Sequence, residues 1–477
     1  MKKSLITRII PVLSLLVLMF AITNCGKKEI KDEAVEVAQE VPLLTYTLQG
    51  KRGLVTHYKR GEILPFENAY LPNPPQSVYS GNLFELRHDY PQTTPSPGDY
   101  PWKKVTNNGL ITQQNSYAYV EALKAYVADD MQKLLYDYQN WDPQQESWYQ
   151  SIWLGNVREP IHGMYVGSEF PAGSLGPDQT GGLTTYVYTL YDQTAAVTLY
   201  RIWGQDSLNA YRPNLTNTAD AQYAEGSVIV KFAFVSLSET WTPMENTATW
   251  DVYTDVDPTK GSPGTSDTTL RTLQLMQFDI IVKDTEAAPQ TGWVFSTLVY
   301  DKDAVGNTAW DRMVPLGATW GGNPDVINTS PEAIGVPAKV NQALTENWIN
   351  MASPSYARST LGWDGRISGP NDGAVVTPAT TQNGDKYQAP TGLSTAGCIA
   401  CHSSAQYPMK SFLLPAVHIP GPNVPLVMYD PGSEGWMKWF SNRSGTEPID
   451  SGQVSLDYDM VTAFKAIPSW EKAIENK

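Results

Sequence analysis

The sequence predicts an α+β protein. Its N-terminal region should be β-rich, either a sandwich or a twisted antiparallel sheet, and a small, mainly helical module should follow at the C-terminus. Three observations predict this class. The composition includes 36 Gly, 35 Pro, 15 Trp and 26 Tyr, which suits strands joined by many turns. Between residues 183 and 301 the chain carries repeated β-branched and aromatic runs. Amphipathic segments near residues 116–141 and near the C-terminus predict helices.

The length and composition indicate more than one compact region. With 477 residues, of which 41% are hydrophobic, the chain is long enough to bury two or three cores. We expect a signal peptide at 1–24, a flexible tether at 25–42, a β-rich domain of unknown role at 43–380, and the helical module at 381–477.

The N-terminus has the pattern of an export signal. A basic start precedes a mainly apolar run at residues 9–22 that is too short to span a bilayer comfortably. The run ends in "AITNC", which resembles the lipobox of bacterial lipoproteins. This resemblance implies that Cys25 carries the lipid anchor. The alternative is an ordinary secretion signal, since Asn24 stands where Gly, Ala or Ser is usual.

The N-terminal pattern and the net charge predict the location of the protein and argue against one class of partner. The resemblance implies a place in the bacterial cell envelope, anchored by lipid to a membrane and facing the periplasm or the cell surface. The segment after Cys25 is charged and nearly free of large apolar residues, as a tether would be. Lys and Arg number 34 against 49 Asp and Glu, a net charge of -15. Because this charge repels phosphate backbones, no nucleic-acid partner is expected.

Five runs of the β-rich region read as strands. They are residues 183–191, 195–203, 227–237, 273–284 and 292–301. In the fourth run, apolar and polar residues alternate in the way expected of a strand with one face in solvent. The alternating residues are Phe278, Ile280 and Val282 on one side and Gln277, Asp279 and Lys283 on the other.

A helix is predicted from Ser116 to about Trp141. Its apolar residues recur every three or four positions and form one face. They are Val120, Leu123, Val127, Met131, Leu134 and Tyr138. In the C-terminal module, "SLDYDMVTAFKAIPSW" predicts a second helix that begins with Ser455 as its N-cap and is stopped by Pro468.

The motif with the most specific chemistry is "GCIACH", which contains Cys398, Cys401 and His402. A zinc site needs four ligands, and the chain has no second cysteine pair. A thiol oxidoreductase needs a strand before the motif, and the preceding stretch is polar. Covalent attachment of haem uses all three residues, since the thiols bond two vinyl groups and the histidine binds iron. A disulfide of an exported protein is the main alternative.

On these residues the chain resembles the cytochrome c family. The resemblance covers Cys398 to His402, with the length and closing helix of the region from about 380 to 477. It implies that Cys398 and Cys401 hold one haem c covalently and that His402 is the proximal iron ligand. It also implies a cytochrome c-like fold for the C-terminal module.

A sixth iron ligand, if there is one, should come from beyond the motif. Met437 is the preferred candidate, because we expect it in a Pro- and Gly-rich loop flanked by two Trp residues. Met428 and His418 are the alternatives. Met409 is too near in sequence to reach the opposite haem face, and Met460 belongs to the predicted helix. An open iron is the remaining possibility.

The predicted function is electron transfer by an exported haem c protein whose partner is a redox protein or a small-molecule electron donor or acceptor. Two alternatives remain. One is a haem enzyme, a peroxidase or oxidase, in which the β-rich region forms the substrate pocket and Arg158 and His162 face the haem. For His162 we prefer a structural role. The other is a ligand-binding module coupled to a cytochrome.

Overall fold

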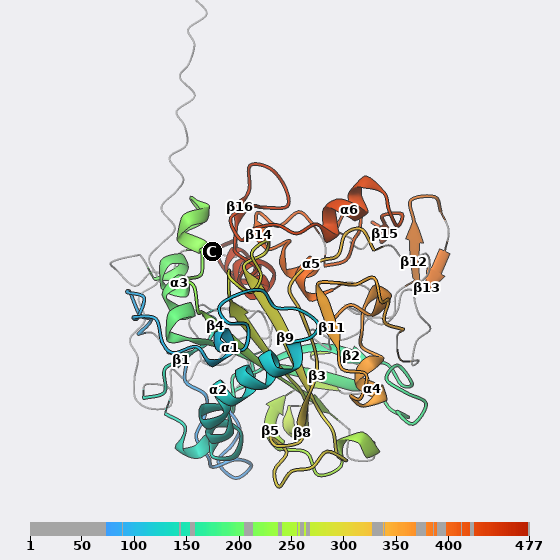
Figure 1. Cartoon of the computed structure of the whole chain (residues 1–477). Coiled ribbons are helices and arrows are strands. Elements are labelled where there is room, and N and C mark those ends of the chain that lie inside the picture. The colour runs from blue at the N-terminus through green and yellow to red at the C-terminus, as the bar shows by residue number, and fades with distance from the viewer. Residues whose placement is uncertain are drawn as a thin grey trace, which may run out of the picture. The chain divides into compact units, whose positions relative to one another are not determined.

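The computed structural model describes most of the chain from residue 73 to 475 (Figure 1). The residues outside the description are 1–72, 88, 143–144, 153–157, 205–212, 237–240, 255, 258–261, 264–267, 327–336, 338, 369–377, 385, 389–396, 412, 420–423 and 476–477. The expected signal peptide, the tether and Cys25 therefore lie outside the described residues. The residues that are described belong to one compact unit, Leu43–Lys477.

A nine-stranded antiparallel sheet organises the described chain. Along its main path the strands follow the order β1-β3-β4-β8-β9-β10-β11, with β2 paired to β3 and β5 paired to β8. The strands are β1 (Trp148–Tyr149), β2 (Tyr165–Phe170), β3 (Leu183–Asp192), β4 (Val228–Ser236), β5 (Thr249–Thr254), β8 (Thr269–Lys283), β9 (Trp293–Tyr300), β10 (Met313–Thr319) and β11 (Asn347–Ile349). The expected strands at 183–191, 227–237, 273–284 and 292–301 are confirmed.

Apart from the helices α2 and α3, the remaining elements are short. Three small sheets contain β12 (Pro378–Thr381), β13 (Lys386–Gln388) and β15 (Val427–Met428); β14 (Gln406–Tyr407) and β16 (Val454–Ser455); and β6 (Val256–Asp257) and β7 (Ser262–Pro263). The α-helices are α1 (Pro101–Val105), α2 (Ser116–Tyr136), α3 (Gln193–Trp203), α4 (Ser355–Arg358), α5 (Cys398–His402), α6 (Glu434–Phe440) and α7 (Ile467–Glu475). The other helical turns are η1 (Tyr138–Asn140), η2 (Thr218–Ala221), η3 (Thr242–Met244), η4 (Trp363–Gly365) and the π-helix η6 (Val461–Ala466). None of the helices in the described ranges is both long and apolar enough to cross a membrane.

Helix α2 confirms the amphipathic pattern read from the sequence. Its predicted apolar face is buried from Val120 to Leu134, and the predicted extension to Trp141 is the separate turn η1. The indole Nε1 of Trp250, on β5, donates to the Leu135 carbonyl at 3.0 Å. This bond fixes the end of α2 against the sheet.

The run at 195–203 is a helix, so its prediction as a strand is wrong. Asp192 ends β3 and caps α3, because its carboxylate accepts a hydrogen bond from the amide of Ala195 at 2.8 Å. The buried residues of α3 run without a break from Thr194 to Leu199 and resume at Ile202 and Trp203, so most of the helix is enclosed. β-branched and aromatic residues favoured a strand here, but the cap and tertiary packing override that local preference.

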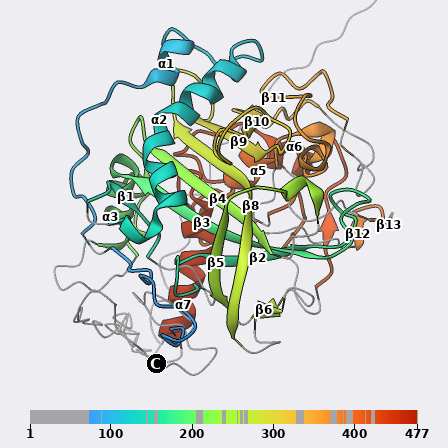
Figure 2. The same ribbon diagram turned by 90° about the horizontal axis from the view of Figure 1, so that it is seen from below.

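Both faces of the central strands are covered, so the prediction of a half-buried strand at 273–284 is also wrong. One face carries the row Tyr188, Phe232, Phe278 and Leu298, and the other carries Thr189, Lys231, Asp279 and Thr297. All eight side chains are buried. Figure 2 shows α2 on the near side of the sheet and the C-terminal segment, in red, on its far side. The face of this strand that we expected to contact solvent is therefore covered by the C-terminal segment.

The C-terminal helix begins and ends later than predicted. Ser455 lies in β16, where it pairs with Gln406. Helical structure begins only at η6, and it continues through Pro468 to Glu475. Pro468 is the second residue of α7, which follows η6 without a break. Pro468 therefore does not stop the helix.

Candidate functional site

The cysteine motif forms α5, a single helical turn that begins after Gly397. The amide of Cys401 donates to the Gly397 carbonyl at 2.9 Å, and the amide of Cys398 donates to the Ile367 carbonyl at 2.8 Å. Residues three apart lie on the same helix face, so the two sulfur atoms lie on one side of the turn. Both cysteines are buried and are thiols rather than a disulfide. Burial raises the pKa of the Cys398 thiol, which donates to the Ser368 carbonyl at 3.3 Å.

Cys398, Cys401 and His402 line a cavity of about 1010 Å³, measured to include its open mouth. The sheet forms one wall through two neighbouring rows. The polar row is Thr189, Lys231, Asp279 and Thr297, and the apolar row is Tyr191, Ile229, Ile281 and Phe295. The chain from Asp457 to Lys465 contributes a further wall.

His402 is held in one orientation. Its Nδ1 lies 2.8 Å from the backbone oxygen of Tyr458, and its ring packs on Phe295 with centroids 4.7 Å apart. A carbonyl oxygen can only accept a hydrogen bond, so Nδ1 carries the hydrogen and Nε2 has the lone pair. Metal-binding histidines commonly donate their other ring N–H to a carbonyl in this way. The tautomer of His402 is therefore the one that suits a metal ligand.

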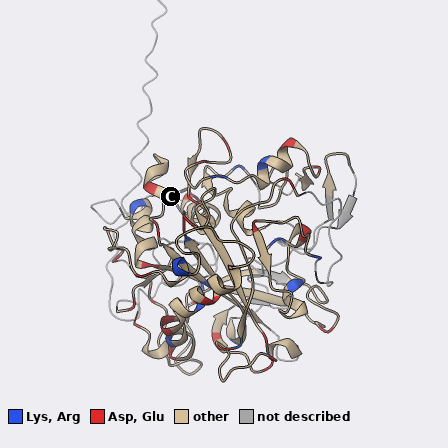
Figure 3. Cartoon of the chain, in the orientation of Figure 1, with Lys and Arg blue, Asp and Glu red and all other residues tan. Residues whose placement is uncertain are grey.

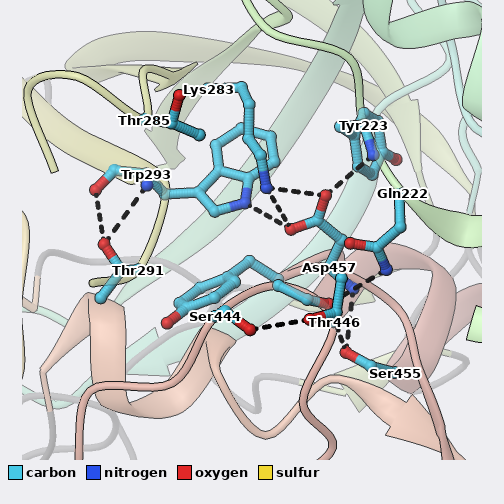
Figure 4. A network of polar contacts seen from close by, with 12 residues as sticks. Gln222, Tyr223, Lys283, Thr285, Thr291, Trp293, Ser444, Thr446, Ser455 and Asp457 are labelled. Carbon is cyan, nitrogen blue, oxygen red and sulfur yellow. Dashed lines mark hydrogen bonds and ion pairs between the residues drawn. The ribbon is translucent and has the colours of Figure 1, made fainter. Parts of the chain in front are cut away.

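The turn that supplies this carbonyl has an unusual backbone. Asp457 and Tyr458 have φ values of 44° and 69°, in the left-handed region that residues other than glycine seldom adopt. Both residues are buried. Backbone conformations of this kind persist where the surroundings over-determine them, and they cluster at functional sites. The contacts that hold the turn are shown in Figure 4.

The polar row of the sheet contains a buried ion pair. The ammonium group of Lys231 lies 3.5 Å from Asp279 Oδ2. The other carboxylate oxygen of Asp279 accepts from Gln277 Nε2 at 2.6 Å and from Thr297 Oγ1 at 2.9 Å. The pair lies on the wall that faces the cysteines, and Asp279 contributes to the raised pKa of Cys398. The cavity therefore combines apolar walls with a few polar groups of fixed geometry.

The methionines beyond the motif have different positions. Met437, the preferred sixth ligand, lies in α6 rather than in a loop, because Ser433 caps the helix by accepting from the amide of Trp436. Met437 does not line the cavity, and neither do Met428 and His418. Met460 does line it, with its sulfur 3.9 Å from the hydroxyl oxygen of Ser404.

Arg158 and His162 do not reach this cavity. His162 stacks on Trp250 with ring centroids 4.2 Å apart, and Trp250 packs on Phe232 and Phe234. These phenylalanines belong to the sheet face opposite the polar row. Arg158 donates to the carbonyl of Ser151 at 2.5 Å. The structure thus places His162 on the α2 side of the sheet and the cysteine motif on the other.

Several cavity residues were not singled out from the sequence. Lys231 and Asp279 stand within otherwise apolar strand segments, "VIVKFAF" and "FDIIV". A charged residue in a run whose neighbours are all apolar was the signal that could have indicated a functional wall. Asp457 and Tyr458 gave no such signal, because a left-handed turn of non-glycine residues depends on tertiary contacts.

The described residues fit a haem. Two buried thiols on one helix face, a histidine of fixed tautomer and apolar walls are what its covalent attachment and axial ligation need. Within the described ranges, no three or more His, Cys, Asp or Glu side chains are grouped to hold a metal ion by themselves. A haem supplies four nitrogen ligands of its own, so the protein need contribute only the axial positions.

No family model, curated protein or solved structure matches the chain.

Proposed function

We propose that this chain is a haem c-binding electron-transfer protein with a cytochrome c-like site in its C-terminal part. One observation carries the proposal: a single helical turn presents two buried thiols and an oriented histidine to one cavity. A bound haem supplies an iron that gains and loses one electron. The thiols of Cys398 and Cys401 hold the group covalently, and Nε2 of His402 occupies the axial position.

The walls of the cavity support the same role. The apolar row of the sheet lines one side of the site, and the polarity of the surroundings is one of the ways in which a protein sets the potential of a haem. The residues of this wall come from the sheet, whereas the thiols and the histidine come from the C-terminal segment. The proposed redox site is therefore built by both parts of the chain.

The test is the mass of the mature protein. Intact protein produced with a haem-attachment system should carry the mass of one haem beyond that of the mature polypeptide and its lipid on Cys25, and it should keep the haem through denaturation in acid-acetone. The double variant Cys398→Ala/Cys401→Ala should carry none. Cys25→Ser is the matched control, because it removes the third cysteine and should keep the haem. Release of all haem from the wild type on denaturation would contradict the proposal.

The envelope location is part of the same proposal. We infer a lipid anchor on Cys25, which holds the protein at a membrane within reach of a redox protein or a small-molecule donor or acceptor. Basic residues are scattered among acidic ones along the described chain (Figure 3), a distribution unlike the basic stripe of a nucleic-acid-binding surface. A fatty-acid analogue should label the wild type and fail to label Cys25→Ser.

A haem enzyme is the second candidate, and the buried Lys231–Asp279 pair is the observation that favours it. A charged pair in the wall of a cavity can bind or orient a polar substrate. The optical spectrum separates the two functions. A low-spin ferric spectrum that peroxide does not change supports electron transfer. A high-spin spectrum with a rapid response to peroxide, lost in Lys231→Met, supports the enzyme.

A further inference from the structure

The backbone oxygen that accepts the hydrogen bond from His402 belongs to Tyr458. The neighbouring residue, Asp457, holds the conformation of Tyr458. Tyr458 has a left-handed φ of 69°, which costs free energy for a bulky side chain. Its hydroxyl donates to the Arg443 carbonyl at 2.7 Å, which fixes the ring. The ring contact alone does not set the direction of the Tyr458 carbonyl, which also depends on how the backbone is held at Asp457 and Asp459, the residues on either side.

Asp457 is fixed from three directions (Figure 4). Its side chain is fully buried, and its two carboxylate oxygens lie 2.7 and 2.9 Å from the ammonium nitrogen of Lys283. Oδ1 also accepts from the indole Nε1 of Trp293 at 2.8 Å, and Oδ2 accepts from the backbone amide of Tyr223 at 2.8 Å. These donors come from β8, from β9 and from the segment after η2. The carboxylate therefore ties the left-handed turn to the sheet.

The space around Asp457 leaves no room for another arrangement. A Cβ atom at Gly445 would lie 1.8 Å from Asp457 Oδ1, so the backbone of residue 445 packs directly on the carboxylate. The next residue of the turn is anchored as well, since Asp459 accepts from the hydroxyls of Tyr223 at 2.6 Å and Tyr191 at 3.2 Å. The backbone between the two carboxylates is thus clamped at both ends, and the Tyr458 carbonyl lies between them.

We propose that Asp457 is a positioning residue for the iron ligand, because it holds the Tyr458 carbonyl on Nδ1 of His402. This inference rests on the proposed function, since it assumes that Nε2 of His402 binds the haem iron. A hydrogen bond from Nδ1–H to a fixed acceptor sets the orientation of the imidazole and makes Nε2 a stronger donor. A stronger donor favours the ferric state and lowers the midpoint potential of the haem.

The decisive comparison uses two variants that remove the same charge. Asp457→Gly removes every contact of the carboxylate, while glycine adopts the left-handed φ without strain. Asp457→Asn keeps an oxygen acceptor and tolerates the same φ. Any effect of charge on the haem is the same in both. An effect of positioning is larger in the glycine variant.

The readouts are the iron–histidine stretching frequency and the midpoint potential of protein shown by mass to carry its haem. We expect Asp457→Gly to lower the frequency and to shift the ferrous–ferric equilibrium about tenfold toward ferrous, about 59 mV for a one-electron couple. Asp457→Asn should show less than half of this shift. Equal shifts in both variants, or no shift in either, would overturn the inference.

Asp284→Asn is the matched control. Asp284 is equally buried, and its carboxylate accepts from the Tyr119 hydroxyl at 2.7 Å and the Ala287 amide at 3.0 Å, away from His402. It should lower thermal stability without moving the frequency. If Asp457→Gly does not accumulate, the test compares the iron–histidine stretching frequency of Asp457→Asn with that of Asp284→Asn. Equal frequencies in these two variants refute the inference. A wild type without covalent haem refutes the proposed function instead.

Discussion

At the residue scale, burial makes the contributions of Glu159 and His162 to the stability of the fold change with pH in opposite directions. Burial raises the pKa of Glu159 to about 7 and lowers the pKa of His162 to about 3. Backbone amides, among them those of Ile161, His162 and Met164, donate to the Glu159 carboxylate and oppose part of the rise in its pKa. His162 is stacked against Trp250, where the charged imidazolium would be poorly solvated.

We expect Glu159→Gln to remove a loss of stability that the wild type shows as the pH rises from about 4.5 to about 7. Glu159 binds its proton more tightly in the folded state, so its contribution is fully present below its ordinary pKa and is lost as pH rises to about 7. The difference between the two limits is up to about 3 kcal/mol. Urea unfolding of wild type and Glu159→Gln at a series of pH values checks this. Parallel curves between about pH 5 and 8 would contradict it.

His162→Phe should act on the acid side. His162 is neutral in the folded state, so its contribution is present above its ordinary pKa and is lost as pH falls toward 3. Phenylalanine keeps the stacking on Trp250 and cannot be protonated. The variant should therefore lose less stability than the wild type as pH falls from about 7 to about 4. A steeper loss in the variant would show that the histidine ring contributes something other than a neutral aromatic surface.

On the proposed function, the position of Met437 in α6, outside the residues that line the cavity, leads to a prediction about the sixth iron ligand. Met437→Ala should leave the ferric haem spectrum and carbon monoxide binding unchanged. Met460→Ala alters a side chain that lines the cavity, and it should change both. Loss of the weak sulfur-to-iron absorption in Met437→Ala alone would instead restore Met437 as the ligand.

At the element scale, the cap of α3 joins a helix to a strand. The Asp192 carboxylate accepts from the amide of Ala195 and also, at 3.1 Å, from the amide of Val228 at the start of β4. Asp192→Ala should destabilise the protein by about 0.5–2 kcal/mol, the usual cost of losing an N-cap. Asp192→Asn keeps an acceptor and should cost much less. Equal midpoints for the two variants in thermal unfolding would show that the cap is not the source of the effect.

Elements with a clear period were predictable from the sequence, and elements set by distant contacts were not. Helix α2 and strands β3, β4, β8 and β9 carry their pattern in their own residues. Helix α3 has strand-like composition and is fixed by Asp192. The second face of β8 could not be predicted as buried, because the segment that covers it follows more than a hundred residues later. The motif residues of the candidate site stood out in the sequence, whereas the wall opposite them did not.

At the scale of the whole molecule, the sheet and the C-terminal segment share one core. A single cluster of buried side chains runs from Phe84 through the sheet to Ile467 and includes both cysteines of the motif. We expect one cooperative thermal transition for the folded unit. Chain cut by protease near residue 380 should elute as one species until denaturant is added. Release of a folded fragment of residues 381–477 under native conditions would show a separable module.

The burial of the two thiols also imposes an order on biosynthesis. Cys398 and Cys401 are only 7% and 8% exposed, and the sheet and the turn at Asp457 close around them. On the proposed function, an enzyme that joins a haem to these thiols needs access that the finished fold denies. Haem attachment should therefore precede the docking of the C-terminal segment onto the sheet. Until the haem is attached, the newly exported chain should stay partly folded. Purified apoprotein that has already folded should be a poor substrate for attachment until it is unfolded.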